Sequence, residues 1–415
     1  TGAYLMGKLT TGMLVDYVGG GRVTLALGIF LSSLGSIGIA FVSLFPLICI
    51  FWGGARYFQA MGWPSIAKLI YNWFEPRQYA RIWSITSMAS RSGSILTGLF
   101  ISLLIQFAGY GWREVLWTCG GVGVGVAVVV ACLLRDSPVQ VGLPPVCPGE
   151  NGKEGEDESV LLDGPDKEPA APDGVGVTGG RAGPSVWSEV HRFVREPRFW
   201  LMAFALAMMT ALFEWEAWIP TFIDQTFDVQ DSVPPLIGTT FSAGCLVALL
   251  LGSVLLPRIS RKLQAIVICG SMLCNVLVCG VLLYTTARRA PGENGQSTEG
   301  LPFSSALLVL FGFTLALPVY IPMSVFSLDF GGDSCSLLIG ILDGMAYSAA
   351  LLFDLSLGFI VDGSNGWVTA TGILLTLSVV GFVSLLGFQI MDIHVRAKSI
   401  PDLTFPVSVQ NDKTQ

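Results

Sequence analysis

Long runs of apolar residues constrain this chain more than any other feature. A membrane-crossing helix needs roughly 20 mostly apolar residues, and about eleven such runs lie along the sequence. Their approximate centres are Thr10, Ser32, Gly53, Ser94, Val122, Met208, Gly244, Cys274, Phe313, Ala350 and Val379. Backbone polar groups in lipid must be paired within the protein, so we expect every run to be helical. The sequence therefore predicts an all-α integral membrane protein.

Composition excludes several other classes of protein. Hydrophobic residues make up 52% of the chain and charged residues 13%, with a mean hydropathy of +0.65, which argues against a water-soluble fold. The cysteines are scattered and only two histidines occur, so no metal site is expected. No nucleophile and base pair, phosphate-binding loop or basic nucleic-acid surface stands out. We therefore expect no enzyme activity, no cofactor and no nucleic-acid partner.

The helices fall into two sets separated by a polar segment. Residues 136–197 are rich in Gly, Pro, Asp and Glu, and we interpret them as a disordered cytosolic linker. Residues 1–135 then form one transmembrane half, residues 198–392 the other, and residues 393–415 a tail. Five helices before the linker and six after it fit a twelve-helix, pseudo-symmetric architecture that lacks its first helix. The start at Thr1 rather than Met agrees with a missing N-terminus.

Basic residues indicate the orientation of the helices. Lys and Arg outside the spans lie mostly in one set of loops, which includes the linker and the tail. Cytosolic loops carry such an excess, so we expect the linker and the C-terminus to face the cytosol. The identity of the membrane does not follow from span lengths.

Several motifs resemble one family of transporters. GMLVDYVGGGR, ending at Arg22, is similar to the loop between the second and third helices of major facilitator transporters, and GSVLLPRISRK repeats it faintly in the second half. FQAMGWPSIAKLIYNWF, RDSPVQVGLPP and SLDFGGDSCSLLIGILDG resemble the organophosphate:phosphate antiporters. The resemblance implies the major facilitator fold and exchange of a phosphate ester for inorganic phosphate at a central basic site. Lys8 falls on the second-helix lysine of these relatives, whereas Ser90 and Leu212 stand near their histidine and seventh-helix arginine.

Charges inside the apolar runs are the candidate site residues. An ionised group at the bilayer centre costs at least about 2.5–3.5 kcal/mol, so such groups face a cavity or one another. Lys8, Arg91 and Arg56 lie at similar depth, and we predict that they bind an anionic substrate. The alternative is that buried carboxylates pair with them structurally, and this is the interpretation we favour for Arg56.

The carboxylates allow a different coupling chemistry. Glu214 or Asp343 could couple transport to protons, although a surface position is the simpler expectation for Glu214 and its neighbour Glu216. Asp343 and Asp354 could instead line the cavity or tie their helix to its neighbours. We expect Lys68 to reach the headgroups.

Two further groups of residues lie near predicted helix ends. Asp16 and Arg22 flank the Gly-rich turn and are predicted to hold the cytosolic face closed. We interpret the tryptophans near helix ends as an interfacial belt, and Trp215 and Trp218 as alternative walls of the cavity. The belt residues are Trp63, Trp73, Trp83, Trp112 and Trp117.

Three functions agree with this sequence. The leading hypothesis is a secondary carrier of a small organic anion, such as a sugar phosphate or glycerol phosphate, with inorganic phosphate as counter-ion. The second is a proton-coupled carrier of a carboxylate or amino acid with the same fold. The third is a non-transporting membrane receptor that uses the linker for docking. In each case the surrounding partner is membrane lipid, and no oligomer is required.

Overall fold

The protein is helical throughout the part of the chain that its computed structural model describes. These residues are 2–18, 20–144, 146, 186–227, 229, 233–288, 300–363 and 365–399, and they include no strand. The long helices are α1 (Gly2–Val18), α2 (Gly21–Phe41), α3 (Phe45–Gln59), α4 (Gly62–Trp73), α5 (Tyr79–Ala108), α6 (Trp112–Leu133), α8 (Pro197–Thr226), α9 (Val233–Leu255), α10 (Arg261–Arg288), α11 (Leu301–Gly331), α12 (Cys335–Val361) and α13 (Gly366–Ser399). The expected all-α class is confirmed.

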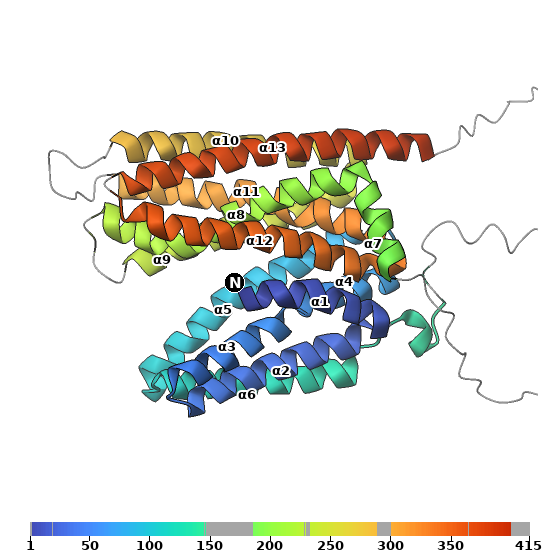
Figure 1. Ribbon diagram of the computed structural model, residues 1–415, viewed down its shortest axis with the longest axis horizontal. Helices are drawn as coiled ribbons and strands as arrows, with labels where there is room; N and C mark the ends of the chain where they lie inside the picture. Colours follow the sequence, from blue (N-terminus) through green and yellow to red (C-terminus); the bar gives the residue numbers. More distant parts are fainter. Residues whose placement is uncertain are drawn as a thin grey trace, which may run out of the picture.

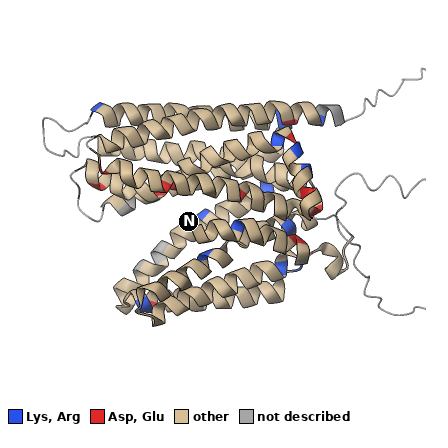
Figure 2. Ribbon diagram, viewed as in Figure 1, with Lys and Arg blue, Asp and Glu red and all other residues tan. Residues whose placement is uncertain are grey.

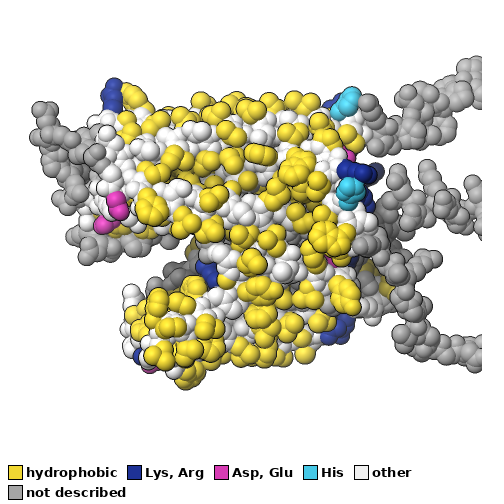
Figure 3. All heavy atoms as spheres, viewed as in Figure 1, with side chains coloured by type: hydrophobic (Ala, Val, Ile, Leu, Met, Phe, Trp, Pro, Cys, Tyr) yellow, Lys and Arg dark blue, Asp and Glu magenta, His cyan; other side chains and the backbone are white. Residues whose placement is uncertain are grey.

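The apolar runs found in the sequence coincide with these helices. Each expected centre lies inside one of them, from Thr10 in α1 to Val379 in α13. By length and apolar composition alone, seven segments of the described chain qualify as membrane spans, and one of them, Leu301–Val361, contains both α11 and α12. Large apolar side chains such as Phe41, Phe107 and Phe359 are exposed, as lipid-facing residues would be. Figure 3 shows hydrophobic side chains spread over the sides of both groups of helices.

The helices form two groups that lie apart at one end of the molecule. Figure 1 shows α1–α6 together, here called the N-terminal bundle, and α8–α13 together, the C-terminal bundle. Most charged residues gather at the end where the short helix α7 (Val186–Arg195) lies, which we call the linker end (Figure 2). At the opposite end, the open end, the surface is hollowed between the two bundles (Figure 3).

Two glycines bring the bundles together near the linker end. A Cβ on Gly340 of α12 would lie 2.8 Å from the carbonyl oxygen of Lys8 and 3.2 Å from the Cα of Gly12 on α1. Only glycines tolerate so close an approach of two helix backbones. The contact therefore fixes α1 against α12 and closes the linker end, while the open end stays apart.

The helix pair α3–α4 bends beside this contact. Pro64, the third residue of α4, has no N–H to donate to the carbonyl of Ala60, so the helix is interrupted at Ala60 and Met61. The break lies next to Arg56 and Gln59, which end α3. Arg56 and Gln59 line a cavity together with Glu214 and Tyr347 of the C-terminal bundle.

The segment expected to be a disordered linker is partly ordered. A short 3₁₀ helix, Pro138–Val141, follows α6, and α7 covers Val186–Arg195. Phe193 of α7 is fully buried, and Arg192 donates to the carbonyls of Phe330 and Gly331 at the end of α11. The disorder expected at both ends of 136–197 is therefore wrong, because α7 docks on the C-terminal bundle. Residues 147–185 lie outside the described part.

Candidate central binding site

Lys8 and Asp343 form an ion pair between the two bundles. The Nζ of Lys8 on α1 lies 2.6 Å from the Oδ2 of Asp343 on α12. Lys8 is fully buried and Asp343 is 7% exposed. The Lys8 ammonium also lies 5.2 Å from the ring centroid of Tyr4, whose edge meets Tyr347 of α12. With one positive and one negative charge, the pair carries no net charge into the interface.

Arg91 of α5 makes a second link between the bundles. Its Nη1 lies 2.9 Å from the Oε2 of Glu216 on α8, and its Nη2 donates to the hydroxyl of Tyr320 on α11 at 2.8 Å. The guanidinium stacks on Phe213, 4.3 Å from the ring centroid. Glu216 also accepts a hydrogen bond from Ser242 of α9. One cation of the N-terminal bundle is therefore held by two helices of the C-terminal bundle, α8 and α11, and α9 holds its partner Glu216.

Arg56 and Glu214 are charged groups without such partners. Among the residues that the structure describes, neither forms an ion pair. Arg56 donates to Gln59 at 3.0 Å, and its guanidinium lies 5.5 Å from the ring centroid of Trp52 on the same helix. Both line one cavity of about 220 Å³, together with Tyr4, Gln59 and Tyr347. We call it the Arg56 cavity. A cation and a carboxylate thus face the same space from opposite bundles.

A second cavity adjoins the first. It measures about 100 Å³ and contains Arg91 and Asp343 in its wall, so we call it the Arg91 cavity. Glu214 and Tyr347 line both cavities, so the two cavities are neighbours. Small-ligand sites usually occupy roughly 300–1,000 Å³, so the two spaces together just reach the lower limit for a small solute.

The charges of this central site are segregated by bundle. The cations Lys8, Arg56 and Arg91 come from α1, α3 and α5, whereas the carboxylates Glu214, Glu216 and Asp343 come from α8 and α12. Of the three cations predicted to share a depth, Arg56 and Arg91 line the two adjoining cavities, and Lys8 is buried behind Asp343. The carboxylates Glu214 and Asp343 of the other bundle line the same cavities. This arrangement can attract an anion to one bundle while the other supplies competing carboxylates.

The linker end is held by a separate set of contacts. The Oδ2 of Asp16 accepts a hydrogen bond of 2.7 Å from the backbone N–H of Leu337, in the first turn of α12, where a negative charge is favoured. Lys68 of α4 lies 3.5 Å from Asp16 and donates to the carbonyl of Asp333. Ser336 donates to the carbonyl of Pro64 at 3.0 Å. Asp16 thus joins the two bundles directly.

Arg22 acts within one bundle. Its backbone N–H donates to Asp136 at 2.8 Å, and its guanidinium donates to the carbonyl of Ala131 near the end of α6. No contact of Arg22 with the C-terminal bundle occurs in the described chain. Of the two predicted gate residues, only Asp16 spans the interface.

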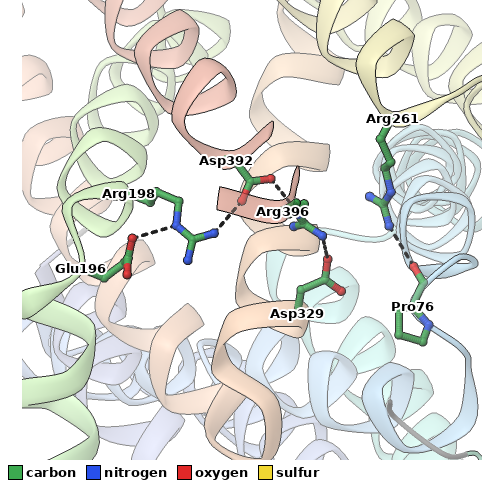
Figure 4. Close-up of polar contacts among 7 residues, drawn as sticks. All are labelled: Pro76, Glu196, Arg198, Arg261, Asp329, Asp392 and Arg396. Atoms are coloured by element: carbon green, nitrogen blue, oxygen red, sulfur yellow. Dashed lines mark hydrogen bonds and ion pairs between the residues drawn. The ribbon is translucent and has the colours of Figure 1, made fainter. Parts of the chain in front are cut away.

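A network of charges covers the C-terminal bundle at the same end (Figure 4). The contacts are Glu196 to Arg198 at 2.8 Å, Arg198 to Asp392 at 3.0 Å, Asp392 to Arg396 at 2.7 Å and Arg396 to Asp329 at 2.7 Å. Arg261 lies beside this network and donates to the carbonyl of Pro76, in the N-terminal bundle, at 3.1 Å.

Several sequence-based expectations about charged residues are wrong. Arg56 was expected in a structural ion pair and has none in the described chain. Lys68 was expected at the headgroups but is 8% exposed, because Asp16 and the turn before α12 supply its partners. A surface position was the simpler expectation for Glu216, but the alternative, a structural ion pair with one of the cations, is what occurs, because Glu216 binds Arg91. Asp343 both lines a cavity and ties α12 to α1, which the sequence left open.

The tryptophans also differ from the expected belt. Trp63 and Trp83 stack on each other, with ring centroids 5.4 Å apart, and line the Arg91 cavity. Trp112 is 54% exposed, as a belt residue would be. Trp215 is fully buried against Trp367, with ring centroids 5.9 Å apart, and lies in the wall of neither central cavity.

Tyrosines are the main site residues that the sequence did not indicate. Tyr4, Tyr320 and Tyr347 contact the charged groups or line the cavities. Polar aromatic residues inside apolar helices were the available signal, since a buried hydroxyl requires a partner.

Comparison with known proteins identifies the class of this fold. The family model described as "Major Facilitator Superfamily" matches residues 1–352 of this chain. The chain therefore belongs to this superfamily and is a multi-pass integral membrane protein. Membership in a transporter family also places it outside the enzymes, as expected.

The relatives agree with the resemblance seen in the motifs. A probable hexose phosphate transport protein of Chlamydia pneumoniae is 28% identical over 144 residues, which cover 35% of this chain and 31% of that protein. Sugar phosphate exchanger 3 of Mus musculus is 22% identical over 346 residues, 81% of this chain and 66% of that protein. The chain thus spans about a third of the first relative's length and just under two thirds of the second's.

Solved structures show the same fold. The crystal structure of the major facilitator transporter FucP in the outward conformation superposes with a TM-score of 0.64 at 12% identity, covering 93% of this chain and 87% of that one. At such low identity the likeness concerns the fold alone.

Proposed function

We propose that the protein is a secondary active transporter of a small organic anion, which it exchanges for inorganic phosphate by alternating access. The preferred substrate is a phosphate ester, such as a sugar phosphate or glycerol phosphate. The arrangement of charge carries this proposal. Arg56 and Arg91 of the N-terminal bundle line two adjoining cavities, and Arg56 has no ion pair in the described chain. Buried Lys8 lies behind Asp343, which lines one of these cavities. The names of the relatives, a hexose phosphate transport protein and a sugar phosphate exchanger, agree with a phosphate ester.

The free cation provides the entry step. A phosphate group that enters from the open end meets Arg56, whose guanidinium can offer two parallel N–H donors. It then competes with Glu216 for Arg91 and with Asp343 for Lys8. Each replacement exchanges one anionic partner of a cation for another, so that no cation is left uncompensated in the interface.

Closure and orientation complete the cycle. We propose that the linker end faces the cytosol and that the two bundles, residues 1–135 and 198–392, rock as rigid halves about the central site. Asp16 acts as a gate because its hydrogen bond to Leu337 must break before the linker end opens. Arg22 supports it indirectly by fixing the turn after α1 against the end of α6.

One observation favours a second function. Glu214 lines both cavities and has no ion pair in the described chain, so it could carry a proton rather than a partner cation. The protein would then be a proton-coupled carrier of a carboxylate or amino acid. Phosphate exchange would be absent in that case, and uptake would follow a pH gradient.

Counterflow in proteoliposomes separates the two functions. Vesicles loaded with unlabelled phosphate receive labelled phosphate outside, and phosphate esters, carboxylates and amino acids compete in turn. We expect labelled phosphate to accumulate, phosphate esters to inhibit it, and Arg91→Gln to reduce it strongly. Arg113→Gln is the matched control, because Arg113 is an exposed arginine at the open end that contacts Ser43 within the same bundle.

The proposal fails if labelled phosphate does not accumulate while a pH gradient drives uptake of a carboxylate. It also fails if Arg113→Gln and Arg91→Gln, folded alike, reduce counterflow equally.

A further inference from the structure

A large pocket at the linker end lies outside the central site. It measures about 530 Å³ and is walled by α10, α11 and α13. Its lining shares no residue with the central cavities, because Ile321, Val325 and Phe326 face the pocket whereas Val319, Tyr320 and Met323 of the same helix face the Arg91 cavity. Helix α11 thus separates the two spaces. We call this space the α10–α13 pocket.

The pocket is amphipathic. Its deeper walls are apolar and include Ile268, Val325, Phe326 and Phe388. Its rim carries Arg261 and Lys262, the first two residues of α10. At 1.5 Å per residue, Ile268 lies about 10 Å farther along α10 than Arg261. A ligand that fills the pocket therefore needs a polar end at the level of the helix termini and an apolar body below it.

In the described chain, the carboxylates near the rim pair directly with Arg396, and not with Arg261 or Lys262. Arg396, the third cation in the lining, is held by Asp329 and Asp392, each at 2.7 Å. Arg261 and Lys262 are exposed, and neither forms an ion pair with any residue that the structure describes (Figure 4). The rim thus offers two cations without a direct ion pair among the described residues above an apolar space, and Asp392 of the same lining is engaged by Arg396 and Arg198. An anionic headgroup with an acyl chain complements both features, whereas a free anion would leave the apolar walls unfilled.

We infer that the α10–α13 pocket binds an anionic phospholipid of the leaflet at the linker end, with its phosphate on Arg261 and Lys262 and an acyl chain along α11 and α13. The site is separate from the substrate site, and only its assignment to the cytosolic leaflet rests on the proposed orientation. The charge attraction also explains the choice of an anionic lipid over a zwitterionic one.

Binding at this site would act on closure of the linker end. The Nη2 of Arg261 donates to the carbonyl of Pro76 in the N-terminal bundle, at 3.1 Å. A lipid phosphate is a stronger acceptor for a guanidinium than a neutral carbonyl and would compete for it. Occupancy therefore removes one of the contacts that close the linker end, and the lipid becomes a regulator of opening.

Native mass spectrometry of the purified protein tests binding without any transported substrate. The protein is titrated with dioctanoyl phosphatidylglycerol, dioctanoyl phosphatidylcholine or inorganic phosphate. We expect tighter binding of phosphatidylglycerol, and a roughly 30-fold loss in the double variant Arg261→Gln/Lys262→Gln, about fivefold for each cation. Arg258→Gln, three residues away and outside the pocket lining, should bind like the parent. If the double variant misfolds, Lys262→Gln alone should show the fivefold loss.

Three results would overturn the site: equal affinity for the two lipids, unchanged affinity in the folded pocket variants, or displacement of phosphatidylglycerol by an equal concentration of inorganic phosphate. Failure of phosphate counterflow would refute the transport proposal and leave this binding result intact.

Cys335 reports the effect on closure, since it begins α12 at the linker end and is fully buried. Its labelling by a soluble maleimide, followed at the peptide level, should rise several-fold with phosphatidylglycerol in the parent and stay constant in Arg261→Gln. Unchanged labelling of the lipid-bound parent would refute the regulatory step.

Discussion

Removing either partner of the Lys8–Asp343 pair should destabilise the protein strongly, and removing both should restore most of the loss. The Nζ–Oδ2 distance is 2.6 Å, and the lysine is fully buried while the aspartate is 7% exposed. Breaking a buried ion pair on one side costs about 3–5 kcal/mol, because a charge remains without compensation, whereas replacing both partners with uncharged groups is often nearly neutral. Asp343→Asn should cost more than Lys8→Met. It leaves the buried Lys8 ammonium unpaired away from both central cavities, whereas Lys8→Met leaves the Asp343 carboxylate unpaired at the wall of one.

A double-mutant cycle measures this effect. Parent, Lys8→Met, Asp343→Asn and the double variant are compared by thermal unfolding in detergent, followed by tryptophan fluorescence. Glu189→Gln is the control, because its ion pair with Arg192 lies within α7 and involves an arginine side chain that is 46% exposed, so its loss should cost at most about 1 kcal/mol. If both central single variants unfold at the temperature of this control, or if their effects simply add, the pair does not hold the bundles together.

Three further outcomes are expected. Asp16→Asn should slow counterflow and leave the thermal stabilisation by substrate unchanged, because the hydrogen bond from Leu337 to Asp16 belongs to the gate. A variant that loses substrate affinity but keeps the same exchange rate per bound substrate would contradict the gate role. Gly340→Ala should lower the free energy of unfolding by about 1–3 kcal/mol, since the new Cβ would lie 2.8 Å from the α1 backbone. Gly280→Ala has open space around it and should be neutral or slightly stabilising. Equal melting temperatures of the two variants would refute the packing argument. Arg56→Gln should raise the KM for phosphate several-fold without changing the melting temperature, and an unchanged KM in counterflow would remove Arg56 from the site.

Depth along a helix could be predicted from the sequence, but the side to which a residue points could not. The apolar runs place the ends of each helix, and counting from those ends gives the similar depth of Lys8 and Arg91. The pairing of Lys8 with Asp343 joins residues 335 positions apart, and it depends on which faces of α1 and α12 meet. Gly12 and Gly340 determine those faces. The sequence shows that each is a glycine in an apolar helix, but it does not show which helix packs against it.

Lys68 shows why the simplest interpretation of a charged residue can fail. A lysine close to the end of an apolar helix normally extends to the headgroups, and this was the expected behaviour. Here the turn between α11 and α12 lies over it, so that Asp16 and the carbonyl of Asp333 become its partners. The sequence of α4 contains no information about that turn. Packing between bundles, rather than local composition, decides the role of the residue.

The same interface offers a physical reason for exchange rather than one-way transport. Rocking of the bundles changes the distances across Lys8–Asp343 and Arg91–Glu216, and each broken pair leaves a charge uncompensated at a cost of several kcal/mol. A bound phosphate ester or phosphate ion stays with the cations of the N-terminal bundle as they separate from the carboxylates. Asp343 borders on a cavity, where water or a proton can compensate its charge, whereas the charge of fully buried Lys8 cannot be compensated in this way. On the proposed mechanism, an anion therefore lowers the barrier in both directions, and the empty carrier remains locked by its own carboxylates.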